Sequence, residues 1–377
     1  MIRYQEKDIL RIAKRINNSR RPYLLVNPLQ AKHIPVSPST ALQMMTSLGE
    51  MVAAKYGDAR LVIGFAETAT AIGAVVAKTI SDECLYIHTT RENVTAVKDY
   101  ILFTEEHSHA TEQKIVADNL NNFFSKTKTI ILVDDEFSTG KTLINMVNRL
   151  RACYPSIVGK KIVAASIINR LSEDNLQRWR DEGIESVCLL KLDNTDYSSA
   201  VESINVEAAS LCSNEYSRSG YSTSVLAQSL PDPRLGVVIS DYYEFCVSKI
   251  DLLKSRCAFQ GKDVLILGTE ECMLPALLIG KAIEDEKDVK SIKCHATTRS
   301  PIGVSKLPGY PIETGFRVHS LYDSRRDTFI YNLQSYDVAV IVSDAKGAYA
   351  RGLFELSMIL KEFGCQEILC LAGTDDV

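Results

Sequence analysis

TIILVDDEFSTGKTLINMVNRL, residues 129–150, contains a short apolar run, two carboxylates, a loop of small polar residues and a helical apolar pattern, in that order. The run Ile130–Val133 is typical of a strand buried on both faces of a parallel sheet. It ends at Asp134 and Asp135. The apolar residues that follow recur at the spacing of one helix face, at Leu143, Ile144, Met146, Val147 and Leu150. The stretch therefore predicts a strand, an acidic pair, a tight loop and a helix, as in α/β proteins.

The loop between this strand and helix consists of Ser138, Thr139, Gly140, Lys141 and Thr142. A loop at a helix N-terminus offers backbone N–H groups and the positive end of the helix dipole, which together bind a phosphate monoester. Carboxylates just before it accept hydrogen bonds from vicinal hydroxyls and hold a divalent metal directly or through water. The combination points to a ribose 5-phosphate as the ligand.

Two other interpretations of this stretch exist. The triplet Gly140-Lys141-Thr142 suggests the phosphate loop of nucleotide triphosphatases, but that motif requires glycine where Asp135 stands. The other is an ordinary strand, turn and helix with solvated acids. It leaves unexplained why the residue types agree at so many consecutive positions.

The length and composition favour a soluble protein of two domains. The chain has 377 residues, enough for two full cores. A net charge of -4 and a pI near 6.0 give no reason to expect nucleic acid or a membrane as a partner. No apolar run approaches the roughly eighteen residues of a membrane span. The N-terminal MIRYQEKDILRIAKR is predicted to be an amphipathic helix without a signal-peptide core, so we expect a cytoplasmic protein.

The ten cysteines are spread singly along the chain, without the paired spacing of zinc sites. Several lie inside apolar runs, such as Cys188 and Cys370. This pattern favours buried free thiols over disulfides.

The segment VDDEFSTGKT, residues 133–142, resembles the PRPP-binding signature of type I phosphoribosyltransferases, where PRPP is phosphoribosyl pyrophosphate. More narrowly, the chain resembles the orotate phosphoribosyltransferase-like enzymes of bacterial tellurite-resistance (stress-response) operons. Those enzymes carry a C-terminal TRSP domain, named for a motif that appears here as Thr298-Arg299-Ser300-Pro301. The resemblance implies a parallel-sheet, Rossmann-like first domain, PRPP and a nucleobase-like acceptor as substrates, and Mg²⁺ as cofactor. It also implies a homodimer and, as further partners, other products of a stress-response operon.

The same resemblance suggests roles for residues outside the central stretch. The loop after the strand 61–63 is similar to the family's pyrophosphate loop, and its candidates are Glu67, Thr68, Ala69 and Thr70. Arg91 and Lys98, with His107 and His109 in a loop that closes over PRPP, are candidates for pyrophosphate contacts or proton donation. Lys32 and His33 lie in an N-terminal hood and are candidates for contacts to the base or phosphate, although a solvated loop is an equal alternative. Asp134 and Asp135 would hold the ribose hydroxyls and, indirectly, the metal.

The rest of the chain predicts further strands and helices. We expect a helix from Pro38 toward Gly57, a helix at 174–181, and strands at 61–63, 85–88, 161–168 and 186–192. About twenty residues after Arg91 show no clear element, which is typical of a lid or of disorder. The predicted domains are 1–195, a phosphoribosyltransferase domain with its hood; 196–235, a polar linker or arm; and 236–377, the TRSP domain.

The C-terminal part repeats the first part in diverged form. Residues 264–270 echo 61–67, residues 295–299 echo 88–91, and residues 340–344 echo 132–135. The paired segments are separated by similar distances along the chain, which suggests an internal duplication and a second α/β domain of similar plan. The second copy retains one carboxylate, Asp344, and has Lys346-Gly347-Ala348 in place of the phosphate loop. Thr298, Arg299 and Ser300 are its candidates for a phosphate-handling surface, with a structural domain as the alternative.

Three functional hypotheses follow. The first is a magnesium-dependent phosphoribosyltransferase that makes a nucleotide or nucleoside-like metabolite. The second is a non-catalytic sensor of PRPP or nucleotide, and the third is a scaffold in a stress-response assembly. The acidic pair favours the first two over the third.

Overall fold

The computed structural model describes residues 2–94, 97–104, 112–212, 223–228, 230–346 and 350–373. The chain divides into two compact units. The first unit contains Met1–Gln5, Gln43–Thr195 and Pro231–Tyr242, and the second contains Glu6–Leu42, Asp196–Leu230 and Tyr243–Val377. Helices α2 (Pro38–Tyr56) and α8 (Ile239–Val247) each begin in one unit and end in the other.

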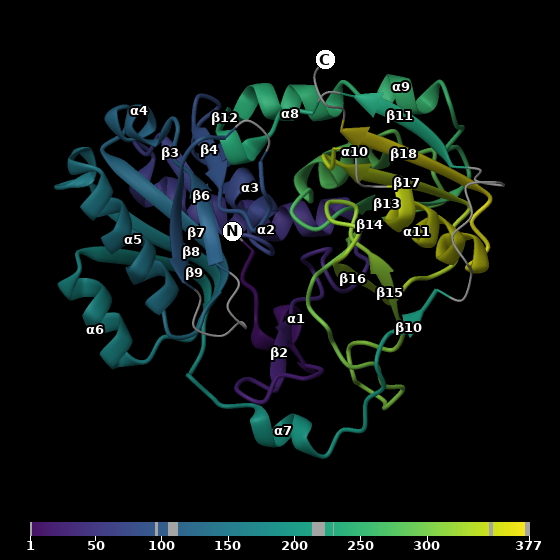
Figure 1. Ribbon diagram of the computed structural model, residues 1–377, viewed down its shortest axis with the longest axis horizontal. Helices are drawn as coiled ribbons and strands as arrows, with labels where there is room; N and C mark the ends of the chain where they lie inside the picture. The colour runs from purple at the N-terminus through teal and green to yellow at the C-terminus, as the bar shows by residue number, and fades with distance from the viewer. Residues whose placement is uncertain are drawn as a thin grey trace. The chain divides into compact units, whose positions relative to one another are not determined.

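A six-stranded sheet of order β12-β4-β3-β7-β8-β9 forms the centre of the first unit (Figure 1). β12 pairs antiparallel with β4, and the other five strands run parallel. A separate antiparallel hairpin consists of β5 and β6. The strand bounds are β3 (Leu61–Gly64), β4 (Leu85–His88), β5 (Tyr100–Thr104), β6 (Glu112–Val116), β7 (Thr129–Phe137), β8 (Lys161–Asn169), β9 (Ile184–Lys191) and β12 (Val237–Val238).

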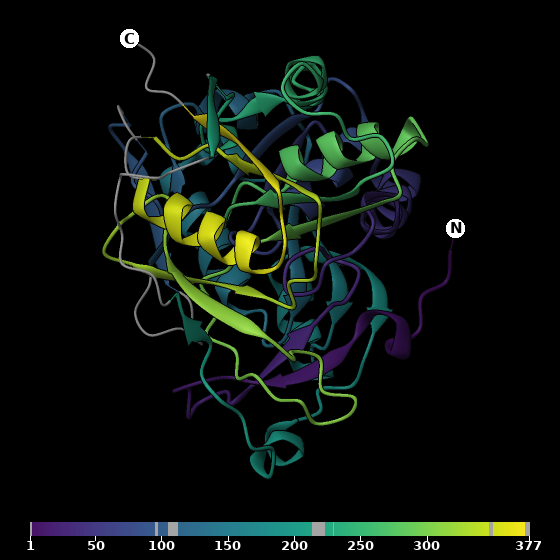
Figure 2. The same cartoon turned by 90° about the vertical axis from the view of Figure 1, so that its right-hand side faces the viewer.

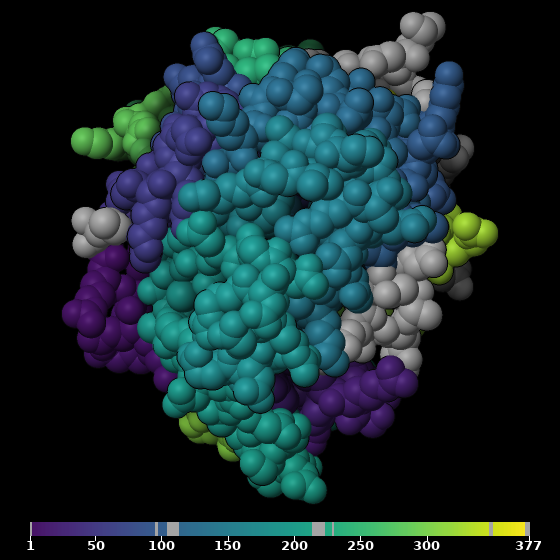
Figure 3. All heavy atoms as spheres, turned by 90° about the vertical axis from the view of Figure 1, so that its left-hand side faces the viewer, coloured from purple at the N-terminus to yellow at the C-terminus, as the bar shows by residue number. Residues whose placement is uncertain are grey.

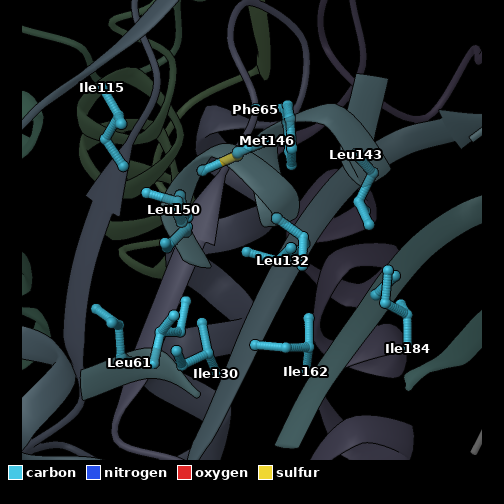
Figure 4. Close-up of a cluster of buried hydrophobic side chains, with 14 of the residues drawn as sticks. Leu61, Phe65, Ile115, Ile130, Leu132, Leu143, Met146, Leu150, Ile162 and Ile184 are labelled. Atoms are coloured by element: carbon cyan, nitrogen blue, oxygen red, sulfur yellow. The ribbon is translucent and has the colours of Figure 1, made fainter. Parts of the chain in front are cut away.

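Helices flank this sheet on both faces (Figure 1). They are α3 (Thr70–Ile80), α4 (Leu120–Ser125), α5 (Lys141–Cys153) and α6 (Glu173–Asp181), with the short turns η1 (Pro155–Ile157) and η2 (Pro233–Leu235). Figure 3 shows, in teal, the outer side formed by the α5 and α6 region. In the core, Leu143, Met146 and Leu150 of α5 face Ile130 and Leu132 of β7 (Figure 4). The predicted helix face and buried strand thus pack against each other.

The second unit contains a five-stranded parallel sheet of order β11-β18-β17-β13-β14. Its strands are β11 (Ser224–Gln228), β13 (Asp263–Gly268), β14 (Ser291–Ala296), β17 (Val338–Ser343) and β18 (Glu367–Gly373). Helices α10 (Leu274–Asp285) and α11 (Ala350–Glu362) lie on this sheet, and Figure 2 shows α11 in yellow across one face. Smaller elements are α1 (Glu6–Ile9), α7 (Ser198–Glu202), α9 (Ile250–Lys254), β1 (Arg11–Lys14), β2 (Tyr23–Val26), β10 (Ser210–Leu211), β15 (Gly315–His319) and β16 (Asp327–Tyr331).

The two units share one plan, in agreement with the predicted duplication. The order β4-β3-β7-β8 in the first sheet corresponds to β14-β13-β17-β18 in the second. Along the chain, an antiparallel hairpin comes between β4 and β7 in the first unit (β5–β6) and between β14 and β17 in the second (β15–β16). The Ala66 N–H donates to Thr89 Oγ1 at 2.8 Å, and the Glu270 N–H donates to Thr297 Oγ1 at 3.0 Å. The correspondence therefore extends to single hydrogen bonds.

Two predictions about local structure are wrong. The N-terminal helix covers only Glu6–Ile9, because Arg11–Lys14 instead pairs antiparallel with the apolar strand Tyr23–Val26. The segment after Arg91 is not structureless throughout, since β5 and β6 pair as a hairpin within it.

The grouping of residues also differs from the sequence-based division. Residues 6–42 belong to the second unit rather than to the first domain. Residues 196–230 are assigned to the second unit, where β10 and β11 each add to a sheet. Residues 231–242 return to the first unit and contribute β12. No disulfide joins any of the ten cysteines, most of which are buried. Across the described ranges, every helix is too short or too polar to span a bilayer.

Candidate functional site

Three consecutive acids at the carboxyl end of β7 are half-buried. Glu136 forms an ion pair with the buried guanidinium of Arg170, with 3.0 Å between Nη1 and Oε1. The Asp135 N–H donates to Asp134 Oδ1 at 2.9 Å. Burial raises the pKa of the Asp135 carboxyl, the charge of Glu136 raises it further, and a hydrogen bond from Thr68 lowers it. Glu136 thus has a structural partner, whereas the two predicted aspartates lie beside the next loop.

The predicted phosphate loop leads directly into α5, which begins at Lys141. Gly140 has a φ of +73°, a conformation that glycine adopts without strain. Its carbonyl accepts a hydrogen bond from Trp179 Nε1 at 3.3 Å, and the Lys141 N–H lies 3.4 Å from Thr139 Oγ1. Trp179 is fully buried, so the loop rests on a rigid aromatic ring. The loop and the first turn of a thirteen-residue helix form an anion-binding arrangement.

The loop after β3 lies at the same edge, because β3 pairs in parallel with β7. It includes Phe65, whose N–H donates to the Val133 carbonyl at 2.8 Å. Gln113 of β6 holds this loop from the other side. Its amide donates to the Ala66 carbonyl at 2.8 Å, and its Oε1 accepts the Thr89 hydroxyl at 2.6 Å. Glu67, Thr68, Ala69 and Thr70 therefore lie beside the acidic pair, on a loop fixed by three strands.

Arg91 follows β4 and is half-buried at this edge. The preceding Thr90 is held by Arg234 of η2, whose Nε donates to Thr90 Oγ1 at 3.3 Å. Arg234 is buried and also pairs with Asp232 at 3.1 Å. Lys98 is exposed just before β5. The sequence analysis missed Gln113 and Arg234, and no local signal identifies either, since both contacts join distant parts of the chain.

Of the other predicted residues, two belong to the second unit and two lie outside the described residues. Lys32 and His33 belong to the second unit, where the Lys32 ammonium is fully buried and donates to the backbone carbonyls of Glu270 and Thr297. A lysine in a loop is usually solvated, and the carbonyls that accept its hydrogen bonds are far away in sequence. The sequence therefore gives no sign that Lys32 is buried. His107 and His109 lie outside the described residues, so their predicted roles stay predictions.

The second-unit candidates have distinct surroundings. Thr298 is buried and forms a backbone bridge with Phe329. Ser300 donates its N–H to Thr298 Oγ1 at 3.2 Å. Arg299, between them, forms an ion pair with Glu270, with 2.6 Å between Nε and Oε2. Thr298 and Ser300 therefore shape the turn that presents Arg299.

Comparisons with known proteins identify the family of this chain. Residues 9–192 match the family described as "Phosphoribosyl transferase", and residues 243–356 match the "TRSP domain C terminus to PRTase_2". The chain belongs to the phosphoribosyl transferases with a C-terminal TRSP domain. It is an enzyme of the phosphoribosyltransferase, or pentosyl-transferring, type. None of the curated proteins matches this transferase.

Among solved structures, the transferase is similar to adenine phosphoribosyl transferase from Trypanosoma brucei in complex with AMP, pyrophosphate and ribose-5-phosphate. The identity is 15%, the match covers 48% of this chain and 76% of that one, and the TM-score is 0.34. Orotate phosphoribosyltransferase from Aeropyrum pernix is 19% identical; the match covers 44% of this chain and 75% of that one, with a TM-score of 0.28. Adenine phosphoribosyltransferase from Leishmania tarentolae is 13% identical; the match covers 51% of this chain and 88% of that one, with a TM-score of 0.35. Family membership rests on the two sequence matches.

The acidic pair fits a divalent cation in part. Asp134 and Asp135 offer carboxylate oxygens, which magnesium prefers. Within the residues that the structure describes, no group of three or more His, Cys, Asp or Glu side chains could hold a metal ion. The chain thus supplies two hard ligands, and substrate oxygens and water would have to complete the coordination.

Asp135→Asn is expected to raise the melting temperature of the ligand-free transferase at pH 7 by on the order of a few degrees. The raised pKa of Asp135 means that the folded state prefers the protonated carboxyl. Its ionisation therefore destabilises the fold as pH rises from the usual aspartate pKa through the raised value, and asparagine removes this penalty. Thermal unfolding from pH 3 to pH 8 measures the effect. A gain in melting temperature that stays constant over this pH range, or a loss of stability at pH 7, would contradict a raised pKa of Asp135.

Proposed function

We propose that this transferase moves the phosphoribosyl group of PRPP to a nucleobase-like acceptor, with magnesium, and releases pyrophosphate. One observation carries the proposal: a carboxylate pair and a helix-terminal anion loop follow the same strand, and Thr68 of the neighbouring loop hydrogen-bonds Asp135. This observation supports the proposal, because PRPP needs hydroxyl acceptors between two loops that bind its phosphate groups.

Each element has a role in this proposal. The loop Ser138–Thr142 and the first N–H groups of α5 bind the 5-phosphate. Asp134 and Asp135 accept hydrogen bonds from the ribose hydroxyls and place negative charge near the developing oxocarbenium carbon. The backbone of Glu67–Thr70, with Arg91 and Lys98, binds the leaving pyrophosphate. Holding donor and acceptor in line supplies much of the catalysis.

Magnesium, when bound, supplies a Lewis acid that neutralises the pyrophosphate charge. Asp134 and Asp135 are the carboxylates that would hold it, directly or through water. The raised pKa of Asp135 supports this role, because a carboxyl with disfavoured charge gains from a nearby cation.

The product would be a nucleotide or nucleoside-like metabolite, and the proposal includes a link to the stress response through the operon-encoded enzymes that the chain resembles. The same site without turnover would make the protein a PRPP or nucleotide sensor. The test is incubation with PRPP, magnesium and a panel of purine, pyrimidine and related bases, with pyrophosphate release as the readout. Release that depends on one base supports the transferase. PRPP binding without release for any base would favour the sensor.

Gln113→Ala is expected to lower kcat/KM for PRPP by about tenfold to a hundredfold, because the loop after β3 loses a partner that fixes its carbonyl. The effect should appear mainly in the KM for PRPP, since Gln113 positions the loop rather than touching the reacting atoms. Gln177→Ala on the exposed side of α6 is the matched control. Equal kinetics for the two variants would remove Gln113 from the site.

A further inference from the structure

An ion-pair cluster with a buried centre lies at the carboxyl ends of β13 and β14 in the second unit. The Glu270 carboxylate is 1% exposed and lies 2.6 Å from Arg299 Nε and 2.8 Å from Arg326 Nη2. Ser320 also donates its hydroxyl to this carboxylate. Glu271, likewise buried, lies 3.7 Å from Arg299 Nη2. The carboxylates fix both guanidiniums, whose side chains remain 12% and 26% exposed.

A third cation supports the same loop. The Lys32 ammonium is fully buried and donates to the Glu270 carbonyl at 2.7 Å and to the Thr297 carbonyl at 2.8 Å. Three cations therefore surround a loop that carries two carboxylates. The arrangement holds the two arginines in defined orientations. Removing these charged groups from water has a large desolvation cost. Arg299 and Arg326 are the members of this cluster that reach the surface.

A hydroxyl-binding group stands next to this cationic edge. Asp344 follows β17 and accepts a hydrogen bond from the Tyr322 hydroxyl, which also lies 3.1 Å from Thr269 Oγ1. Tyr322 and Arg326 belong to the same turn between β15 and β16, and Thr269 precedes Glu270. Asp344 and Tyr322 are half-buried. The cationic and acidic parts of the edge are thus joined by one turn and one loop.

The position of the cluster in the sheet favours ligand binding. In the order β18-β17-β13-β14, the connection from β13 leads toward β14, whereas the connection from β17 leads the opposite way to β18. Open parallel sheets bind their ligands outside the carboxyl ends of the strands at such a switch point. The loops that carry Thr269, Glu270 and Asp344 flank this point.

We propose that this edge of the second unit is a second binding site, for a small phosphorylated sugar. Arg299 and Arg326 bind the phosphate, because guanidinium groups match its oxygens in charge and geometry. Asp344 accepts hydrogen bonds from sugar hydroxyls. Glu270 is a positioning residue that orients both arginines, as buried partners orient the contact residues of other sites. The site is separate from the acidic pair of β7 and does not depend on its function.

Hydrogen exchange on the full-length chain tests this proposal, with ribose 5-phosphate and inorganic phosphate as probes. Both probes should protect the segments 266–273, 296–301 and 320–328. Arg326→Gln should weaken both responses about tenfold to a hundredfold, the effect of losing a charged hydrogen bond. Asp344→Asn should weaken only the response to ribose 5-phosphate. Arg325→Gln is the matched control. It removes the same charge one residue away, from a side chain that is 90% exposed.

Arg326→Lys guards against a folding defect, because it retains a cation beside Glu270 while losing the planar fork. It should fold and still bind phosphate more weakly than wild type. The absence of protection in these segments at saturating probe, or equal weakening by Arg325→Gln and Arg326→Gln, would overturn the proposal. Protection around residues 134–142 reports the first unit separately, so failure of the transferase function is distinguishable from failure of this site.

Discussion

Replacing Asp134 and Asp135 together by asparagine is expected to lower kcat/KM for PRPP by about a hundredfold to ten-thousandfold. Hydrogen bonds to ionised groups contribute about 1.5–3 kcal/mol each, and the variant weakens two of them while removing negative charge beside the reacting carbon. Asparagine keeps the size of the side chain, and the raised pKa of Asp135 indicates that the fold does not need its charge. Steady-state kinetics of pyrophosphate release measure the loss.

Asp174→Asn with Asp181→Asn is the matched control for this double variant. Both residues are exposed on α6, and the change in net charge is the same. The control should retain wild-type kinetics, and thermal unfolding should show that both double variants are folded. If the Asp134, Asp135 variant keeps its kcat/KM within about threefold, the acidic pair is not where the sugar binds.

Gly140→Ala is expected to destabilise the first unit by about 2–5 kcal/mol and to weaken PRPP binding strongly. The residue has a φ of +73°, which costs an alanine roughly 1–2 kcal/mol. Its Cβ would also lie 2.5 Å from Trp179 Nε1. Trp179 is buried and packs against Phe137 with ring centroids 4.9 Å apart, so it has little room to move. Overpacking of this kind costs a further 1–3 kcal/mol or so.

Gly183→Ala isolates the backbone part of this effect. Its φ is +66°, and no atom lies within 4 Å of an added Cβ. Denaturant unfolding should therefore give a smaller loss for Gly183→Ala, with PRPP binding unchanged. Equal losses for the two variants, with binding intact in both, would show that the loop tolerates a shift away from Trp179 and that its shape does not determine phosphate binding.

The central stretch was predictable because its periodicity and residue types agree over many positions. The buried run at 130–133 and the helix after Gly140 both appear as predicted. The end of β7 was not predictable, because pairing with β8 extends the strand through three acids to Phe137. Apolar periodicity cannot reveal a strand whose last residues are acidic and are extended by pairing with β8.

The duplication was also predictable, because its signal is a repeated order of residues rather than a local pattern. The sheet orders of the two units agree with it. The surroundings of Gln113, Arg234 and Lys32 were not predictable. Each side chain has at least one partner in a distant segment, and Arg234 lies 144 residues from Thr90. A short hairpin without a recognisable turn sequence likewise looks like loop until its pairing is known.

Calorimetric titration of PRPP into the wild-type protein, with magnesium and with a chelator, tests the central claim most directly. We predict micromolar binding to the first unit that requires magnesium, and this magnesium-dependent component disappears in the Asp134, Asp135 double variant. No binding to the wild type under either condition would contradict the claim and show that the carboxylate pair and anion loop of β7 no longer bind PRPP.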